Sequence, residues 1–276
     1  FSAVQFVATQ WRSAGEDADG CAAFAGVENI RVSPEFFQRL DRRFDTLNGM
    51  GLLAAPVLLW ALGDSPGSYL PEDQAALLAR YIVARYGAHQ TLWILGGDGD
   101  YRARHADKWR RIGRAVFGKS PRHLVTMHPQ GRHWIADEFR DEEWFGVNAY
   151  QSGHGDGEEH LRWHVQGPPS TEWERQRPMP DLNLEPHYEG HLGYTSREPY
   201  DAHAVRRACY WSLLIGPPAG VSYGAHGVWG WHTEARLPVD HPNTGVGPAW
   251  WEAARFDGST SMQHLREFFD AIPWWR

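Results

Sequence analysis

The stretch Trp-Ile-Leu-Gly-Gly-Asp at residues 93–98 is an apolar run that ends in two glycines and a carboxylate. An apolar run without alternation is typical of a parallel strand that is buried on both faces. Glycine lets the backbone turn sharply and lets a ligand approach closely. The stretch therefore predicts a buried strand that presents Asp98 at its carboxyl end. Taken alone, the same pattern also suits an Asp that caps the following helix.

Strand-like runs alternate with amphipathic helical stretches along the whole chain. The predicted strands are Phe1–Val7, Leu52–Ala61, Thr91–Leu95, His123–His128, Phe145–Tyr150, Leu182–Leu184 and Gly220–Tyr223. The predicted helices are Pro34–Met50, Glu72–Tyr86, His105–Phe117, a short turn in Ala136–Glu143, Glu158–Val165, Asp201–Ile215 and Ser261–Ala271. This alternation indicates an α/β fold with a parallel sheet, and 276 residues suit one (β/α)8 TIM-type barrel. We expect a single domain over residues 1–276 with seven of the eight barrel strands.

The composition excludes several classes of protein. Apolar residues make up 42% and charged residues 22% of the chain, which is ordinary for a globular protein. The net charge is −7 with scattered basic residues, so no nucleic-acid partner is expected. No apolar run is long enough to span a membrane. Cys21 and Cys209 are expected to be free thiols, since two cysteines do not make a disulfide framework.

A second segment repeats the arrangement of strand and carboxylate. The short apolar run Leu182–Leu184 delivers Glu185 at its end, and Pro186 stops further pairing. A salt bridge to a neighbouring loop is the alternative role for this carboxylate. Glu189 is a rival, but we expect it further out in the loop on a solvated face.

Two carboxylates at the ends of separate parallel strands suit the hydrolysis of a glycosidic bond. One protonates the leaving oxygen, and the other attacks the anomeric carbon or activates water. If the N-terminal strand is the second of the barrel, Asp98 follows the fourth strand and Glu185 the seventh. These two strands face each other across a barrel mouth. Fifteen Trp residues add surfaces on which sugar rings can stack.

Other polar and aromatic residues follow the predicted strands and are expected to line the same mouth. The segment 223–231 combines small residues with a His and two Trp, although a turn-rich loop with a buried His would look similar. We expect the substrate-binding residues to be His128, Tyr150, Gln151, His154, His187, Tyr188, His226 and Trp229.

The chain resembles the apiosidase-like glycoside hydrolases. The resemblance rests on WILGGD, LVTMHP, DEEWFGVNAYQSGH, LNLEPHYEG, RRACYWSLLIGPPAGVSYGAHGVWGW, HLREFFDAIPWW and SPEFFQRLDRRFDTLNGMGL, which occur in the family's order over nearly the whole chain. It implies a (β/α)8 catalytic domain, with Asp98 as acid/base and Glu185 as nucleophile of a retaining mechanism. It also implies a carbohydrate substrate, with β-linked apiose in plant pectin side chains as the known activity.

Two departures from the family concern the ends of the chain. The family's first strand and helix, with a GDTAW-like motif, have no counterpart before Phe1, and relatives continue beyond Trp275. We therefore expect a barrel without its first strand, with either a gap beside Phe1–Val7 or another strand filling it. No signal peptide is visible, and a secreted or periplasmic location is expected from the resemblance alone.

Two other functions compete with this interpretation. A metal-dependent hydrolase would use the strand-end histidines, namely His128, His154, His187 and His226. However, the chain contains neither a His-x-His nor a His-Glu-x-x-His spacing, so we expect neither metal nor cofactor. A non-catalytic carbohydrate-binding barrel would suit the Trp content but has no need of both carboxylates. The sequence leaves the sugar, the linkage and the oligomeric state open.

Overall fold

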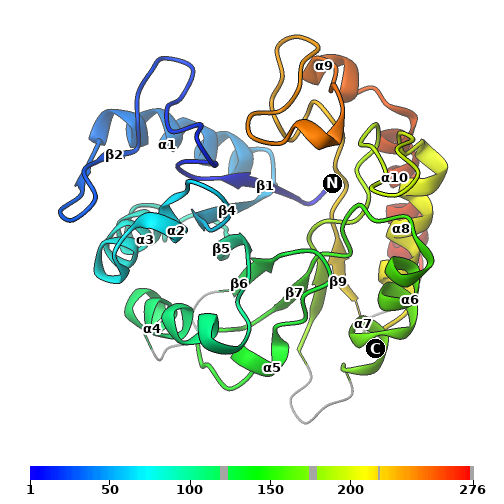
Figure 1. Ribbon diagram of the computed structural model, residues 1–276, viewed down its shortest axis with the longest axis horizontal. Helices are drawn as coiled ribbons and strands as arrows, with labels where there is room; N and C mark the ends of the chain where they lie inside the picture. The colour runs from blue at the N-terminus through cyan, green and yellow to red at the C-terminus, as the bar shows by residue number, and fades with distance from the viewer. Residues whose placement is uncertain (119–123, 174–178, 217, 274–276) are drawn as a thin grey trace. The chain divides into compact units, whose positions relative to one another are not determined.

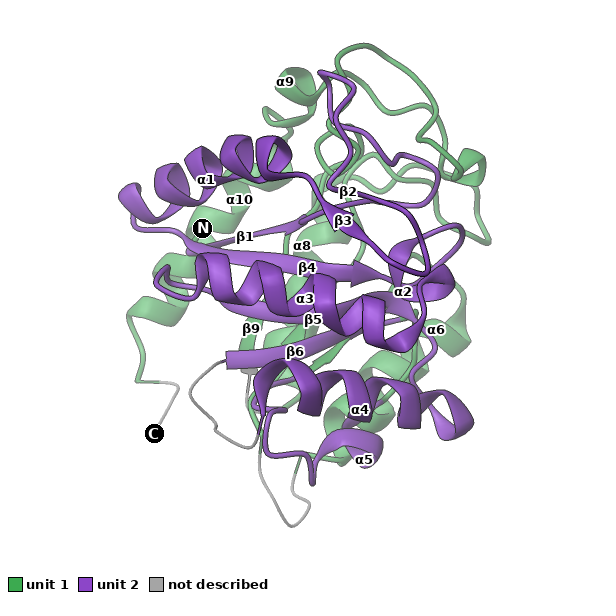
Figure 2. Ribbon diagram, turned by 90° about the vertical axis from the view of Figure 1, so that its left-hand side faces the viewer, with its two compact units in different colours: residues 1, 130–134, 149–276 green, residues 2–129, 135–148 purple. Residues whose placement is uncertain are grey.

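The structure is a computed structural model that describes residues 1–118, 124–173, 179–216 and 218–273. Its contacts divide the chain into two compact units (Figure 2). Unit 2 comprises Ser2–Pro129 and Ile135–Asn148, and unit 1 comprises Phe1, Gln130–Trp134 and Ala149–Arg276. Each unit is described below by itself.

The centre of unit 2 is a four-stranded sheet. Its strands are β1 (Ala3–Val7), β4 (Leu53–Trp60), β5 (Leu92–Gly99) and β6 (Leu124–Pro129), in the order β1-β4-β5-β6. All three pairings are parallel. Seven of the eight residues of β4 are buried, as expected for a strand that is covered on both faces. The predicted parallel sheet is confirmed here.

Helices α1 (Pro34–Gly49), α3 (Glu72–Tyr86) and α4 (Ala106–Phe117) lie along this sheet (Figures 1 and 2). Ser33 caps α1, because its side chain accepts a hydrogen bond from the Phe36 backbone N–H at 3.4 Å. The apolar stripe of α1 buries Phe37, Leu40 and Phe44. Phe44 stacks on Tyr86 of α3, with ring centroids 3.8 Å apart. The helical spacing in the sequence thus reflects the packing of the helix layer.

Apart from Asn148, the second sheet lies in unit 1. Its strands are β7 (Asn148–Tyr150), β8 (Asp181–Asn183) and β9 (Pro218–Val221), in the order β7-β8-β9. The β8–β9 pair is parallel. The helices of unit 1 include α6 (Glu158–Gln166), α8 (Ala202–Leu214) and α10 (Asp257–Asp270). Helices α8 and α10 enclose a core with Val205, Cys209, Met262 and Leu265. Asp201 caps α8 by accepting from the Ala204 backbone N–H at 2.8 Å.

Every predicted strand is present in the described residues, although His123 lies outside them. Within this part of the chain no further strand joins either sheet, and β1 lies at the edge of its sheet. Whether β5 is the fourth barrel strand and β8 the seventh stays a prediction. Both cysteines are free thiols, as predicted.

Several short elements were not predicted. They are the antiparallel hairpin of β2 (Phe24–Ala25) and β3 (Arg31–Val32), the helices α2 (Pro66–Tyr69), α7 (Pro168–Thr171) and α9 (Trp250–Ala253), and the 3₁₀ turns at Ala103–His105 and Pro242–Thr244. The short helical turn predicted in Ala136–Glu143 is present as α5 (Ala136–Phe139). No helix within the described ranges has the length and apolar content needed to cross a bilayer.

Candidate active site

Asp98 lies near the end of β5, after two glycines that the packing requires. A Cβ atom on Gly97 would lie 2.4 Å from Cε3 of Trp60, and one on Gly96 would lie 2.6 Å from the Tyr101 hydroxyl. Asp98 itself has a left-handed backbone, with φ of 47°, and a partly exposed side chain. Helix α4 begins eight residues later with His105 as its N-cap, so Asp98 is not the cap of that helix.

The surroundings of Asp98 within unit 2 are aromatic. The negative charge of Asp98 adds to burial, which is the larger cause, in raising the pKa of Tyr101. His128 of β6 pairs with Gly97 in register and is fully buried. The centroid of its ring lies 6.1 Å from that of Trp60. The carboxyl ends of β4, β5 and β6 therefore bring together Asp98, His128 and Trp60.

Glu185 follows β8 in unit 1, and hydrogen bonds hold its backbone on both sides. Its N–H donates to Oδ1 of Asn183 at 3.2 Å, and its carbonyl accepts from the Gly153 N–H at 2.9 Å. The Asn183 amide is buried and donates to the hydroxyls of Ser152 and Ser212, each at 2.9 Å. A satisfied buried network of this kind fixes the position of Glu185.

The carboxylate of Glu185 makes an ion-pair contact with His154. Nε2 of His154 lies 2.9 Å from Oε1 of Glu185, and the two side chains are 3% and 14% exposed. The His154 carbonyl accepts from the Tyr200 hydroxyl at 2.7 Å, so its backbone is also anchored. A hydrogen bond donated to a carboxylate favours its ionised form. A nucleophile must be ionised, so this contact suits the predicted role of Glu185.

Behind His154 lies His191, which the site prediction omitted. The two imidazoles stack with centroids 3.9 Å apart and an interplanar angle of 23°. Nδ1 of His191 donates to the Leu192 carbonyl at 2.8 Å. Burial, with the charge of His154 as second cause, lowers the pKa of His191 to about 2, so this ring is neutral at ordinary pH. The available sequence signal was its position in the same loop as Glu185 and His187.

The remaining predicted residues of this loop region extend the aromatic wall. The Tyr188 ring centroid lies 4.7 Å from that of His154, and the His226 centroid lies 5.6 Å from that of His191. Trp229 Nε1 donates to Nδ1 of His226 at 3.3 Å, and Nε2 of His226 donates to the Gly245 carbonyl at 2.8 Å. Glu185, His154, Tyr188, His226 and Trp229 are thus linked through consecutive contacts.

His187 has a structural environment of its own. Its Nδ1 donates to the Gly153 carbonyl at 2.9 Å, and its ring stacks on Tyr200 at 4.1 Å with an angle of 6°. Burial is the first cause that lowers the pKa of His187 to about 4. Because Gly153 also bonds the Glu185 carbonyl, His187 supports the backbone beside the carboxylate.

Tyr150 is the last residue of β7, and Gln151 is the first residue after it. Tyr150 is buried, and its ring faces Trp163 and His164 of α6 at 6.1 and 6.2 Å. Its contacts are therefore with the helix layer. Gln151 follows the last residue of β7 and is also buried.

The prediction for Glu189 was wrong. Its side chain is buried, with 7% exposure, instead of solvated. Oε2 accepts from the Tyr223 hydroxyl at 2.7 Å, and Oε1 accepts from the Gly258 N–H at 3.1 Å, in the first turn of α10. The helix dipole and two donors satisfy this carboxylate. It ties the loop after β8 to the segment after β9, a long-range contact that no local pattern reveals.

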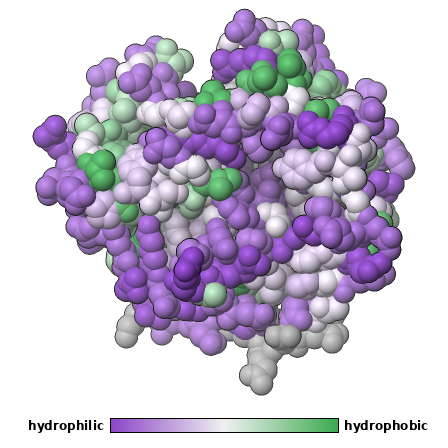
Figure 3. All heavy atoms as spheres, viewed as in Figure 1, coloured by the Kyte–Doolittle hydropathy of each residue, from purple (hydrophilic) through white to green (hydrophobic). Residues whose placement is uncertain are grey.

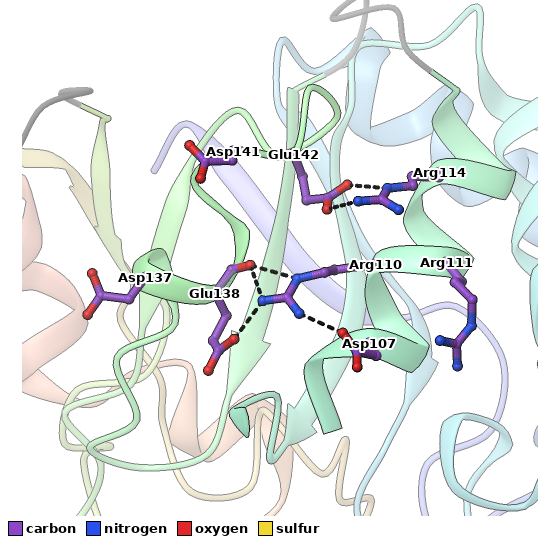
Figure 4. A pocket seen from close by; sticks show the side chains of 8 residues that line it. All are labelled: Asp107, Arg110, Arg111, Arg114, Asp137, Glu138, Asp141 and Glu142. Carbon is purple, nitrogen blue, oxygen red and sulfur yellow. Dashed lines mark hydrogen bonds and ion pairs between the residues drawn. The ribbon is translucent and has the colours of Figure 1, made fainter. Parts of the chain in front are cut away.

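A charged hollow in unit 2 has a different character (Figure 4). Arg110 donates to Asp107 and Glu138, and Arg114 makes a bidentate pair with Glu142. The lining contains no aromatic ring, and its Arg111 pairs with Glu72 of α3, outside the hollow. We interpret the hollow as a set of ion pairs that hold α4 against α5 and the residues that follow it. Among the described residues, no group of three His, Cys, Asp or Glu side chains is arranged to hold a metal ion.

Comparison with known proteins identifies the relatives of this arrangement. The model of the family described as apiosidase-like, catalytic domain, matches residues 1–276. A solved glycoside hydrolase superposes with a TM-score of 0.83 at 21% identity, covering 100% of this chain and 64% of the other. A family 5 glycoside hydrolase from Bacteroides vulgatus also gives 0.83 at 21% identity, covering 100% of this chain and 62% of the other.

A third solved structure is more distant. A family 5 glycoside hydrolase mutant from Prevotella bryantii, in complex with a xyloglucan tetradecasaccharide, gives a TM-score of 0.51 at 12% identity, covering 83% of this chain and 76% of the other. These likenesses show the TIM-barrel fold that the sequence predicted. The chain spans less than two thirds of the length of the first two structures. Comparison with curated proteins gives no match.

Proposed function

Since the chain belongs to the apiosidase-like family of glycoside hydrolase catalytic domains, we propose that it hydrolyses glycosidic bonds in the side chains of plant-type polysaccharides, by a retaining mechanism. The observation that carries the proposal is the contact at 2.9 Å between His154 and the largely buried carboxylate of Glu185. We further propose a secreted or periplasmic location, because polymeric glycans of this class lie outside the cell.

In the proposed first step, Asp98 donates its proton to the glycosidic oxygen while a carboxylate oxygen of Glu185 attacks the anomeric carbon. The bond to the leaving group breaks as the covalent glycosyl ester forms. His154 keeps Glu185 ionised until the attack. In the second step, Asp98 takes a proton from water, whose oxygen displaces Glu185 from the sugar. Each displacement inverts the anomeric centre, so the overall reaction retains its configuration.

The aromatic and neutral lining of the Glu185 region suits a sugar better than a charged substrate. The pKa of His191 is lowered to about 2 and that of His187 to about 4, so neither ring is a cation at neutral pH. Neutral imidazoles and Tyr188 offer hydrogen-bonding atoms and flat apolar faces together. We propose that Gln151, His154, Tyr188, His226 and Trp229 contact the bound sugar.

The test is a screen of aryl glycosides, beginning with apiosides and arabinofuranosides, on the wild-type protein and on Glu185→Gln. We expect turnover by the wild type, none by the variant, and a first product of retained configuration by proton NMR. Full turnover by the variant, or an inverted first product, contradicts the mechanism. Binding of glycans without turnover by either protein favours a non-catalytic barrel.

A further inference from the structure

An exposed pair of stacked indoles lies beyond the residues placed in the active site. Trp231 is 62% exposed, and its ring stacks on that of Trp250, with centroids 4.7 Å apart and an angle of 9°. Trp251 meets Trp250 edge-on at 5.7 Å and is itself 42% exposed. Apolar side chains gather on the surface over the loop that precedes α9 (Figure 3). The free face of Trp231 is therefore a flat aromatic surface open to solvent.

The backbone of Trp231 is held in an unfavourable conformation. Its φ is 48°, in the left-handed region that bulky side chains rarely adopt. The preceding residue is Gly230, which would adopt this conformation without strain. Strained positions of this kind persist only where the surrounding structure enforces them, and they cluster at ligand sites. The strain here presents an indole, an apolar ring that would otherwise favour burial, to the solvent.

The surrounding turn is rigid. A Cβ atom on Gly227 would lie 2.3 Å from the Pro248 carbonyl oxygen, and one on Gly230 would lie 2.5 Å from Nε2 of His232. The Trp250 N–H donates to the His232 carbonyl at 2.7 Å, which ties the two indole-bearing segments together. A rigid aromatic surface binds a ligand without first losing conformational freedom.

The same turn leads into the Glu185 region. The Trp231 N–H donates to the Val228 carbonyl at 2.9 Å, and Trp229 between them donates to His226. The segment that follows Trp231 carries both signs of charge, since Glu234 and Arg236 are exposed. A flat indole face with no charge preference matches the C–H face of a neutral sugar ring.

We propose that Trp231, supported by Trp250, binds a sugar ring of the polymeric substrate outside the residue whose bond is cleaved. This proposal rests on the proposed function for the identity of the ligand. In this proposal, Trp231 contributes to binding of the polymer, and Glu185 takes part in bond cleavage. Loss of the indole should weaken binding of long glycans about tenfold, the effect of one aromatic stacking contact, and should leave small aryl glycosides unaffected.

The test is affinity electrophoresis in gels that contain soluble plant pectin or xyloglucan, with wild type, Trp231→Ala, Trp231→Phe and Trp231→Leu. Phe268→Ala, which removes another exposed aromatic ring, is the matched control. We expect polysaccharide to retard the wild type, the Phe variant and the control, and to retard the Ala and Leu variants about tenfold less. Circular dichroism and the melting temperature verify that each variant is folded.

Three results would overturn the proposal. The first two are no retardation of the wild type in either gel and equal retardation of the Ala variant. The third is retention of binding by Leu together with loss by Ala, which indicates a general apolar contact with the polysaccharide instead of stacking on an aromatic ring. Trp231-dependent retardation in a protein without aryl glycosidase activity would sink the proposed function while supporting this platform. Aryl glycosidase activity without Trp231-dependent retardation does the reverse.

Discussion

Nε2 of His154 lies 2.9 Å from Oε1 of Glu185, and the ring of His154 is stacked in turn on a neutral His191. The stack leaves His154 little rotational freedom, so its N–H stays directed at the carboxylate. In the proposed mechanism, this orientation of one ring by another keeps Glu185 ionised. The variants below separate this positioning from the chemistry and from the stability of the fold.

His154→Phe keeps an aromatic ring against His191 but removes the N–H that Glu185 accepts. We expect the acid limb of the kcat/KM profile to move to higher pH, because the ionised carboxylate loses a stabilising donor. His191→Phe is the companion variant, which preserves the contact with Glu185 and should move the limb less. The measurement is kcat/KM for an aryl glycoside from pH 4 to pH 8, and an unmoved limb in His154→Phe would refute the role of this contact.

Asp98→Asn should discriminate between leaving groups. A poor leaving group needs protonation as its bond breaks, and general acid catalysis of this kind contributes about 10²–10⁴-fold. A good leaving group needs little protonation, so its glycosylation step should change much less. The measurement is the pre-steady-state burst for aryl glycosides that span a range of phenol pKa values. Equal loss across the series would show that Asp98 is not the acid.

Glu189→Gln tests the rival carboxylate. We expect aryl glycoside turnover to persist, in contrast with Glu185→Gln, because Glu189 serves the Tyr223 hydroxyl and the first turn of α10. Glu189→Ala should lower the free energy of unfolding by about 2–3 kcal/mol, since it leaves buried donors unsatisfied. Urea denaturation measures this effect. Abolished turnover in a well-folded Glu189→Gln would transfer the nucleophile role to Glu189.

Buried histidines predict a loss of stability in mild acid. Burial lowers the pKa of His164 to about 4 from its ordinary 6.5, so as the pH falls the unfolded chain takes up the proton before the folded one does. Stability contributed by the neutral ring is complete above pH 6.5 and is lost progressively toward pH 4. Each such group contributes a slope of about 1.4 kcal/mol per pH unit within this window.

The matched variants for this slope are His164→Gln and His264→Gln. Gln can keep a hydrogen bond to Ser212, whereas His264 lies on α10 with a side chain that is 74% exposed. Urea denaturation at pH 6 and pH 5 should show a slope about 1.4 kcal/mol per pH unit smaller in His164→Gln and an unchanged slope in His264→Gln. The same slope in His164→Gln as in the wild type would contradict the assignment.

The sequence predicted the regular elements well, because each has a local signal. Buried strands such as Leu53–Trp60 are continuous apolar runs, and α1 has its cap, its Pro and its stripe within one segment. The β2–β3 hairpin has only two residues in each strand, too few for a periodic pattern. Short helices such as α2 are stabilised by their surroundings and leave a similarly weak signal.

The candidate site was predictable where residues follow strands and less so where loops fold onto each other. Glu185 and His154 were both expected at strand ends, and within unit 1 they are in contact. His191 and Glu189 acquire their partners from loops that the sequence pattern cannot bring together. The burial of Glu189 depends on Tyr223 and Gly258, which are 34 and 69 residues away.

The left-handed backbone of Asp98 has a consequence for how this position should vary among relatives. With φ of 47°, glycine would suit the backbone better than aspartate. Selection would keep an acidic residue here only while its carboxylate is needed. In relatives that keep the barrel without the proposed hydrolysis, position 98 should change to Gly sooner than position 185. The residue at position 98 of a relative would then indicate whether that relative can hydrolyse glycosidic bonds.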